Sequence, residues 1–300
     1  MHNRTTVLDA PPALTPLLAR GAALSLLKRR PRPGVVHTPT RLTLPGVRID
    51  LARLAAYERV CGFATGADAL PVTYPHVLGF PLAMRLMAAR SFPLPLLGLV
   101  HTSIEITRHQ PLGTTSEYEL TTFVQELTPH HRGTQAVVVT EAGTDGTVVW
   151  ESRSTYLARH RTPRRTGPTP PPTAPGERNA TSSEAGRPPV MATWRVGADT
   201  GRRYAAVSGD RNPIHLHPLT ARPFGFPRAI AHGMWTVARC LAEHPTDGPL
   251  HVRADFKAPV LLPGTVTYTS EGTSFALRGD GDRLHLTGEA RDLDALPADG

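Results

Sequence analysis

The stretch FPRAIAHGMWTVAR, residues 226–239, decides the fold, because it joins an aromatic–proline start to apolar residues at helical spacing. Such spacing predicts the buried face of an amphipathic helix. An earlier stretch, YPHVLGFPLAMRLM at residues 74–87, has the same start and the same kind of face. The apolar residues concerned are Leu78, Leu82 and Leu86 in the earlier stretch and Ile230, Met234, Val237 and Leu241 in the later one. The chain therefore contains two related helices.

Two further blocks repeat around these helices in the same order. YERVCGF (57–63) matches YAAVSGD (204–210) in its Tyr, Val and Gly, and it precedes the helix in both cases. GLVHTSIEITRHQPL (98–112) parallels PLHVRADFKAPVLLPG (249–264) and follows the helix in both cases. Segments of alternating polar and apolar residues come after each copy, which is typical of antiparallel strands. The sequence thus predicts an α+β protein with two similar halves.

A segment at residues 161–190 separates the two halves. It is dense in Pro, Thr, Gly and Ser and almost free of apolar residues, which is typical of a linker stiffened by polyproline II conformation. We expect an N-terminal arm at 1–44, a first domain at 45–160, the linker at 161–190 and a second domain at 191–297. The apolar start of the arm is broken by Pro16 and Arg20, and its basic residues come last, unlike in an export signal.

Composition and charge indicate which partners and which cellular compartment to expect. The chain carries a net charge of +8, and 40% of its residues are hydrophobic. Its basic segments lie beside no helix-turn-helix, zinc-finger or aromatic RNA-binding motif, so we expect no nucleic-acid partner. No apolar run approaches the roughly 20 residues of a membrane helix, so we expect no membrane span. The two cysteines, Cys61 and Cys240, give no disulfide framework, which fits a reducing cytoplasm.

The segment SGDRNPIHLHP, residues 208–218, collects polar groups suited to chemistry. Its two prolines remove backbone donors and favour a shaped loop over a regular helix. Asp210 and His215 lie five positions apart, and each can take or give a proton near neutral pH. Asn212 between them offers a donor and an acceptor that could orient the pair or hold the loop. A loop bent at Gly209 and Pro213 could aim both side chains at one point.

The longer motif YAAVSGDRNPIHLHPLTARPFGFPRAIAHGM, residues 204–234, resembles the signature of the MaoC-like, or R-specific hydratase 2, family. That signature runs Tyr-Ala, then Ser/Thr-Gly-Asp-x-Asn-Pro-Ile/Leu-His, and later Ile-Ala-His-Gly-Met. The matching residues are Tyr204, Ala205, Ser208, Gly209, Asp210, Asn212, Pro213, Ile214, His215, Ile230, Ala231, His232, Gly233 and Met234. The resemblance implies a double hotdog, in which two antiparallel sheets each wrap around a long central helix.

The resemblance also implies an activity and a set of site residues. It implies a hydro-lyase of fatty-acid or related acyl-chain metabolism, an (R)-specific 2-enoyl-thioester hydratase that in reverse is a 3-hydroxyacyl-thioester dehydratase. Asp210 and His215 would be the catalytic pair, and the Gly233 N–H would belong to an oxyanion hole. Asn212 and His232 would join Gly233 in substrate binding. The thioester would be carried by CoA or an acyl-carrier protein, without cofactor or metal. We expect a cytoplasmic protein that can form a homodimer.

Other interpretations compete with these roles. Asp210 is also a common turn residue, and His232 fits a structural position beneath the loop. His217 completes an HLH pattern that suggests a metal site, but the sequence offers no third ligand at suitable spacing. The rival functions are a non-catalytic acyl-thioester-binding hotdog protein, a nucleic-acid binder suggested by charge alone, and a hotdog thioesterase. A thioesterase needs a carboxylate on the central helix, where Glu243 stands only at the end.

The first half lacks the catalytic residues of the second. A gapless match places Phe63, Thr65 and Asp68 opposite Asp210, Asn212 and His215. It also places Pro81 opposite Gly233, and a proline has no N–H to offer an oxyanion. We therefore expect one active site per chain, in the second half. The resemblance to double-hotdog hydratases implies that the first half helps to form an acyl tunnel, in which the loss of catalytic side chains would make room for long or branched chains.

Overall fold

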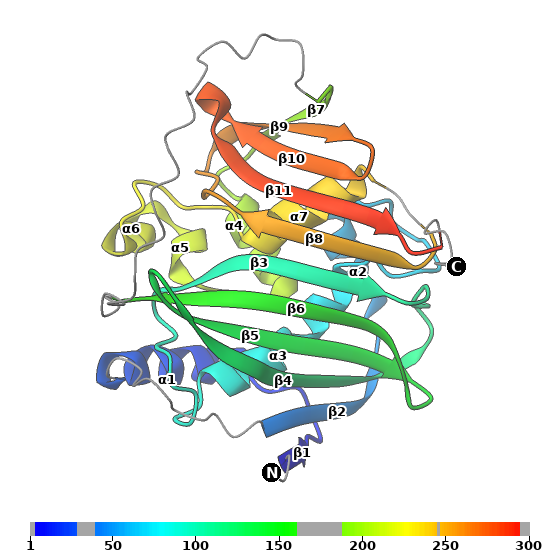
Figure 1. The fold of residues 1–300 in the computed structure, drawn as a ribbon, viewed down its shortest axis with the longest axis vertical. Helices are drawn as coiled ribbons and strands as arrows, with labels where there is room; N and C mark the ends of the chain where they lie inside the picture. The colour runs from blue at the N-terminus through cyan, green and yellow to red at the C-terminus, as the bar shows by residue number, and fades with distance from the viewer. Residues whose placement is uncertain (1–3, 29–39, 161–187, 245–246, 295–300) are drawn as a thin grey trace, which may run out of the picture.

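The computed structural model describes residues 4–28, 40–160, 188–244 and 247–294 (Figure 1). Its strands form an 11-stranded sheet in the order β1-β2-β4-β5-β6-β3-β8-β11-β10-β9-β7. The first half of the chain supplies β1 to β6, and the second half supplies β7 to β11. The two halves therefore share one continuous sheet, with the larger helices on one side of it (Figure 1).

The first half is organised around helix α3. Its strands are β1 (Arg4–Val7), β2 (Thr40–Arg48), β3 (Leu99–Arg108), β4 (Glu117–His130), β5 (Gly133–Thr144) and β6 (Thr147–Arg159). Its helices are α1 (Leu14–Leu27), α2 (Leu51–Cys61) and α3 (Tyr74–Met87). Most side chains of α3 are buried, and the helix packs against β4 and β5. It is the central helix of this half.

The second half is organised around helix α7. Its strands are β7 (Val190–Val196), β8 (Leu250–Phe256), β9 (Gly264–Glu271), β10 (Ser274–Gly279) and β11 (Leu284–Asp292). Its α-helices are α4 (Thr200–Ser208), α5 (Pro213–Leu216), α6 (Pro218–Ala221) and α7 (Gly233–Ala242), with short 3-10 turns η1 (Arg222–Phe224) and η2 (Asp280–Asp282). Seven of the ten residues of α7 are buried, including Val237, Ala238 and Cys240 at 0% exposure.

The strand order shows how the halves are related. It reads β2-β4-β5-β6-β3 in the first half, and the second half repeats this pattern in reverse as β8-β11-β10-β9-β7. The halves meet where β3 pairs antiparallel with β8, with Ser103 opposite Asp255 and Arg108 opposite Leu250. Each half thus presents one antiparallel sheet and one central helix. The α+β double hotdog expected from the sequence is confirmed.

Contacts between helices of the two halves position the segment that follows α4. The Trp235 indole N–H of α7 donates to the Val60 carbonyl of α2, at 2.8 Å. Arg53 Nε of α2 donates to the Val207 carbonyl near the end of α4, also at 2.8 Å. The first half therefore holds the end of α4 in place, just before Asp210.

Several element boundaries differ from the sequence expectations. α7 begins at Gly233, so the prediction that Ile230 lies on its apolar face is wrong, and Ile230 instead forms an isolated bridge with Leu261. β1 pairs in parallel with β2, which begins at Thr40, so residues of the expected arm lie in the sheet. Most of the expected linker, 161–187, lies outside the described residues. Within the described ranges, no helix is long and apolar enough to cross a membrane.

Candidate active site

The site begins where α4 ends. Gly209 caps α4 with a φ of +81°, a conformation that favours glycine, and its N–H donates to the Ala205 carbonyl. A Cβ at this position would lie 2.5 Å from Leu14 Cδ1 of α1. The chain can therefore turn sharply out of the helix at this point, which delivers Asp210 to the site.

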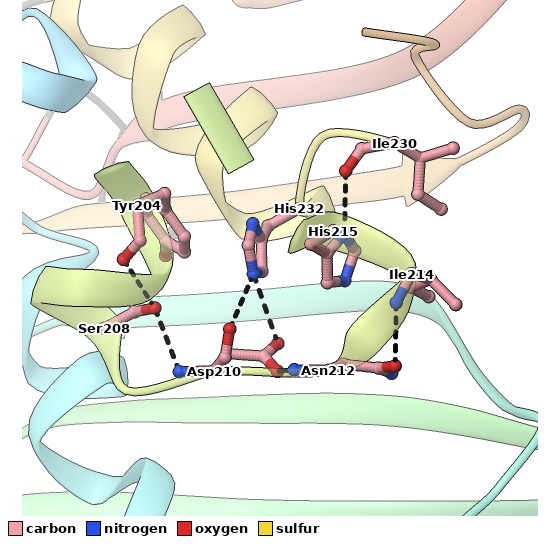
Figure 2. A network of polar contacts seen from close by, with 8 residues as sticks. All are labelled: Tyr204, Ser208, Asp210, Asn212, Ile214, His215, Ile230 and His232. Carbon is pink, nitrogen blue, oxygen red and sulfur yellow. Dashed lines mark hydrogen bonds and ion pairs between the residues drawn. The ribbon is translucent and has the colours of Figure 1, made fainter. Parts of the chain in front are cut away.

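Asp210 is held by its neighbours in a compact turn (Figure 2). Its backbone N–H donates to Ser208 Oγ at 3.2 Å, and its carboxylate Oδ1 accepts from the Asn212 N–H at 3.2 Å. The side chain remains 29% exposed. The carboxylate is thus fixed in direction and still open to a reactant. The turn that competed with catalysis as an explanation of Asp210 is present, and it leaves Oδ2 without a backbone partner among the described contacts.

Asn212 connects Asp210 to His215. Its side-chain oxygen accepts from the Ile214 N–H at 3.4 Å, which makes Asn212 the N-cap of α5. The shaped loop expected here contains two four-residue helices, α5 and α6, because Pro213 and Pro218 stand at first helical positions, where a missing N–H costs nothing. Asn212 therefore holds the loop and sets where His215 lies.

His215 is the buried imidazole that follows Asn212 in α5. It is 8% exposed, and its ring Nδ1 lies 2.8 Å from the Ile230 carbonyl. A carbonyl only accepts, so Nδ1 carries the proton and Nε2 carries the lone pair. Burial lowers the pKa of His215, although the Asp210 charge and the Ile230 carbonyl raise it in part. The ring is accordingly neutral at pH 7, with Nε2 ready to accept a proton.

His232 lies beneath the loop, 2% exposed, with its ring stacked on that of His215 at 3.7 Å between centroids. Its Nε2–H donates to the Asp210 backbone carbonyl at 2.9 Å and lies 3.9 Å from Asp210 Oδ2 (Figure 2). Burial lowers the pKa of His232 well below its usual value, so this contact is not an ion pair. His232 therefore positions both Asp210 and His215.

Asp210, His215 and His232 together raise the question of a metal. One side-chain ligand atom from each lies within 4.8 Å of the others. The two rings are stacked with only 24° between their planes, so the lone pairs of their nitrogens lie in two nearly parallel planes. Metal ligands must instead converge on one point about 2 Å away. The arrangement suits proton transfer better than metal binding.

The HLH pattern has a structural explanation. His217 Nδ1 accepts from the Leu219 N–H at 3.2 Å and so caps α6. The histidine that lies beside Asp210 and His215 is not His217 but His232. Its place in the IAHGM part of the motif is the sequence feature that indicates it.

Gly233 begins α7, next to this group. A Cβ here would lie 2.8 Å from the Phe256 ring of β8, so the residue must be small because of that ring. The first turn of a helix leaves N–H groups without intrahelical partners, and no side chain caps α7. These N–H groups and the positive end of the helix dipole favour a developing negative charge.

The carboxylate needed for the thioesterase alternative lies elsewhere. Glu243 is the C-cap of α7, at the opposite end from Gly233, and it pairs with Arg239 at 2.7 Å. In the first half, Thr65 and Asp68 are exposed, and Pro81 lies inside α3 and not at a helix start. The described part of the first half has no counterpart of the Asp210 group at these positions.

Sequence reasoning missed two residues of the first half that lie near Asp210. The charge of Asp210 raises the pKa of both His76 and Tyr156, although burial is the larger influence on each. Neither residue belongs to a recognisable motif. Only the way the two halves pack reveals them.

Comparisons with known proteins agree with this geometry. Residues 180–278 match the family model described as a MaoC like domain. 3-Hydroxyacyl-thioester dehydratase X of Mycobacterium tuberculosis is 37% identical over 244 residues, which cover 80% of this chain and 84% of that protein. An (R)-specific enoyl-CoA hydratase of Aeromonas caviae is 34% identical over 115 residues, which cover 32% of this chain and 84% of that protein.

A solved structure extends the comparison to three dimensions. The crystal structure of HtdX from Mycobacterium tuberculosis matches with a TM-score of 0.70 at 33% sequence identity. The match covers 84% of this chain and 100% of that chain, so it includes both halves of the fold. The similarity in sequence spans the same large share of the chain as the similarity in structure. The chain therefore belongs to the MaoC-like family.

Proposed function

We propose that the protein is an (R)-specific 2-enoyl-thioester hydratase that also runs in reverse as a 3-hydroxyacyl-thioester dehydratase. The observation that carries the proposal is that the partly exposed Asp210 carboxylate and the buried, neutral His215 ring have ligand atoms within 4.8 Å of each other. The names of the mycobacterial and Aeromonas relatives support this chemistry and its stereochemistry.

The separation of the two groups suits one water molecule. A water that hydrogen-bonds two partners at about 2.8 Å each holds them roughly 4.5 Å apart. Nε2 of His215 would accept a proton from this water as its oxygen attacks C3. The hydroxyl of the water forms the new C3–O bond, and a proton is delivered to C2 to form the new C2–H bond. This proton passes through His215 and Asp210, which return to their starting protonation states. Dehydration follows the same steps in reverse.

The thioester carbonyl gains negative charge while C2 carries carbanion character. Donors already aimed at that oxygen stabilise the transition state more than the ground state. The N–H of Gly233 at the uncapped start of α7 is the donor we assign. Asn212 and His232 then act indirectly, by holding His215 and Asp210.

The remaining assignments follow from the chemistry of the substrate. Hydration needs no redox or group-transfer cofactor, and we assign the thioester to CoA or an acyl-carrier protein in acyl-chain metabolism. We further propose a cytoplasmic location and a homodimer. Domains at 45–160 and 191–297 remain our proposed division of the chain.

The test follows the enoyl-thioester absorbance band with trans-2-enoyl-CoAs of several chain lengths. We expect turnover by the native protein and a kcat at least ~10²-fold lower in Asp210→Asn and in His215→Ala, because each group handles a proton. Asp68→Asn, at the exposed counterpart in the first half, is the matched control and should keep its kcat. Full activity in Asp210→Asn or His215→Ala would end the assignment of roles. Release of free CoA thiol would instead reveal a thioesterase.

A further inference from the structure

A group of polar side chains lies buried in the first half, between its sheet and α3. Ser152 and Ser154 of β6 are 1% and 2% exposed, and His76 of α3 is 9% exposed. Ser152 Oγ, His76 Nδ1 and His101 Nε2 have no hydrogen-bond partner among the described residues. Because an unpaired buried polar group costs free energy, a purely structural core would not accumulate three of them here.

A bulge in β3 brings His101 into this group. The register against β6 shifts between His101 and Ser103, after which Ile104 and Ile106 are fully buried. The His101 ring stacks on Tyr156 at 4.6 Å and lies 6.2 Å from the His76 ring, with 13° between the planes. His101 of β3 and the two serines of β6 thus lie on the inner face of the sheet, and His76 of α3 lies beside His101.

This group adjoins the catalytic site. The Phe256 ring lies 4.9 Å from the His101 ring, and the same ring occupies the space beside Gly233 at the start of α7. On the other side, the charge of Asp210 reaches His76 and raises its pKa, while burial lowers that pKa overall to about 4. Burial lowers the pKa of His101 to about 3, so both rings are neutral at pH 7.

The second half shows that the fold does not need these polar groups. β11 occupies the place beside β8 that β6 occupies beside β3. Its residues facing Phe256, Ala254 and Val252 are Leu286, Gly288 and Ala290, which carry no polar side-chain atom. The same architecture is therefore built without them, and a ligand explains the imidazoles and hydroxyls better than packing does.

We propose that the first half recognises an oxygen on the acyl chain beyond C3, a hydroxyl or keto group, through the neutral imidazoles of His76 and His101. The inference rests on the proposed function, because it takes Asp210 and Gly233 to mark where C3 and the thioester carbonyl bind. A neutral imidazole offers one donor and one acceptor, which suits an uncharged hydroxyl or carbonyl and not a carboxylate. The Phe256 ring, which is partly exposed, must move for such a chain to reach His101.

The experiment compares matched substrates on the same protein. We would measure kcat/KM for hex-2-enoyl-CoA against its 5-hydroxy and 5-oxo derivatives, and for oct-2-enoyl-CoA against its 7-hydroxy and 7-oxo derivatives. We expect at least one oxygenated substrate to be preferred about fivefold or more over its plain counterpart. The ratio is internal to each variant, so a general loss of activity does not disturb it.

Two substitutions at each histidine separate polarity from ring packing. Phe keeps the stacked ring and removes both nitrogens, whereas Gln keeps a donor and an acceptor and removes the ring. We expect His76→Phe and His101→Phe to abolish the preference, and the Gln variants to retain part of it. His285→Phe is the matched control, since His285 is equally buried but bonded to the Ala258 carbonyl, and it should keep the preference.

The outcomes distinguish this inference from the proposed function. The inference is overturned if the kcat/KM of every oxygenated substrate is no higher than that of its plain counterpart. It is also overturned if the preference survives in both Phe variants. If no enoyl-CoA is turned over, the proposed function fails. The preference for an oxygenated chain is then measured as the ratio of the Kd of hexanoyl-CoA to that of 5-hydroxyhexanoyl-CoA. Where a Phe variant does not fold, the Gln variant of the other histidine and the wild-type ratio still decide the matter.

Discussion

Asn212 and His217 perform the same local task for consecutive short helices, but only one of those helices carries a catalytic group. Asn212 caps α5, which holds His215, and His217 caps α6. A side-chain cap contributes about 1 kcal/mol, roughly a fivefold change in the population of the capped form. We therefore predict that Asn212→Ala lowers kcat about fivefold to tenfold with little change in KM, because His215 loses its fixed position.

His217→Ala is the matched control for this prediction. It should cost similar thermal stability and leave kcat within about twofold of the native value. Steady-state kinetics and thermal unfolding of both variants make the comparison. Equal losses of kcat in the two variants would show that the Asn212 cap has no special connection to the chemistry.

Individual residues were predictable only where a motif marked them. Asp210, His215 and Gly233 were identified through the long motif, and the structure brings Asp210 and His215 together and places Gly233 at a helix start. His76 and His101 carried no such signal. A lone histidine in an apolar segment says nothing about a partner far away in the sequence, and the bulge that turns His101 inward depends on pairing with β6.

At the scale of elements, the start of α7 depends on one close contact with β8. Adding a methyl group in Gly233→Ala places it 2.8 Å from the Phe256 ring, a distance that real Cβ atoms do not tolerate, so the helix start or the ring must shift. We predict a kcat at least about tenfold lower, because the N–H groups at that helix start would lose their alignment with the thioester oxygen.

The double variant checks the cause of that loss. Phe256→Leu combined with Gly233→Ala removes the edge of the ring and should recover part of the lost kcat, so the two changes are not additive. Steady-state rates for the two single variants and the double variant complete the cycle. Strict additivity would show that the contact with Phe256 does not explain the glycine.

Elements were easier to predict than their ends. The helical spacing of apolar residues predicted both central helices, but Ile230 was placed on α7 because apolar periodicity continued past the true helix start. The Ile230 and Ala231 N–H groups instead donate to the carbonyls of Ile214 and Val260. The helices α5 and α6 were not foreseen because proline in a short segment indicates a break unless it stands at the first helical position.

For the whole molecule, buried neutral histidines link stability to pH. Burial lowers the pKa of His215 and His232, and it lowers those of His76 and His101 to about 4 and about 3. In the unfolded chain these groups titrate near 6.5, so the unfolded state binds more protons below that pH. Their contribution to stability is full above about pH 6.5 and is lost as pH falls toward the folded values.

We therefore predict a free energy of unfolding that is clearly smaller at pH 5.5 than at pH 7.5, in denaturant titrations by circular dichroism. Each such histidine contributes a slope of up to about 1.4 kcal/mol per pH unit. The His76→Phe variant should show a shallower dependence, since one titrating group is gone. A native protein as stable at pH 5.5 as at pH 7.5 would contradict the assignment of neutral buried rings.

The architecture of the whole molecule was predictable because three blocks recur in the same order in both halves. The register that joins β3 to β8 was not, since pairing between strands so distant in sequence depends on the assembled core and leaves no local pattern. The same limit concealed the electrostatic influence of Asp210 on His76 and Tyr156 of the first half. From the sequence, the first half differs from the second by lacking the Asp-Asn-His set. The packed structure adds that its His76 and Tyr156 lie near Asp210.

The joining of two halves through β3 and β8 has a consequence for heredity. In a pair of identical subunits, every inherited change appears in both copies, so one copy cannot acquire a new lining while the other keeps its chemistry. When both copies belong to one chain, each can accept substitutions separately. The serines of β6 and their apolar counterparts on β11 are differences of the kind that such a tandem gene can accumulate.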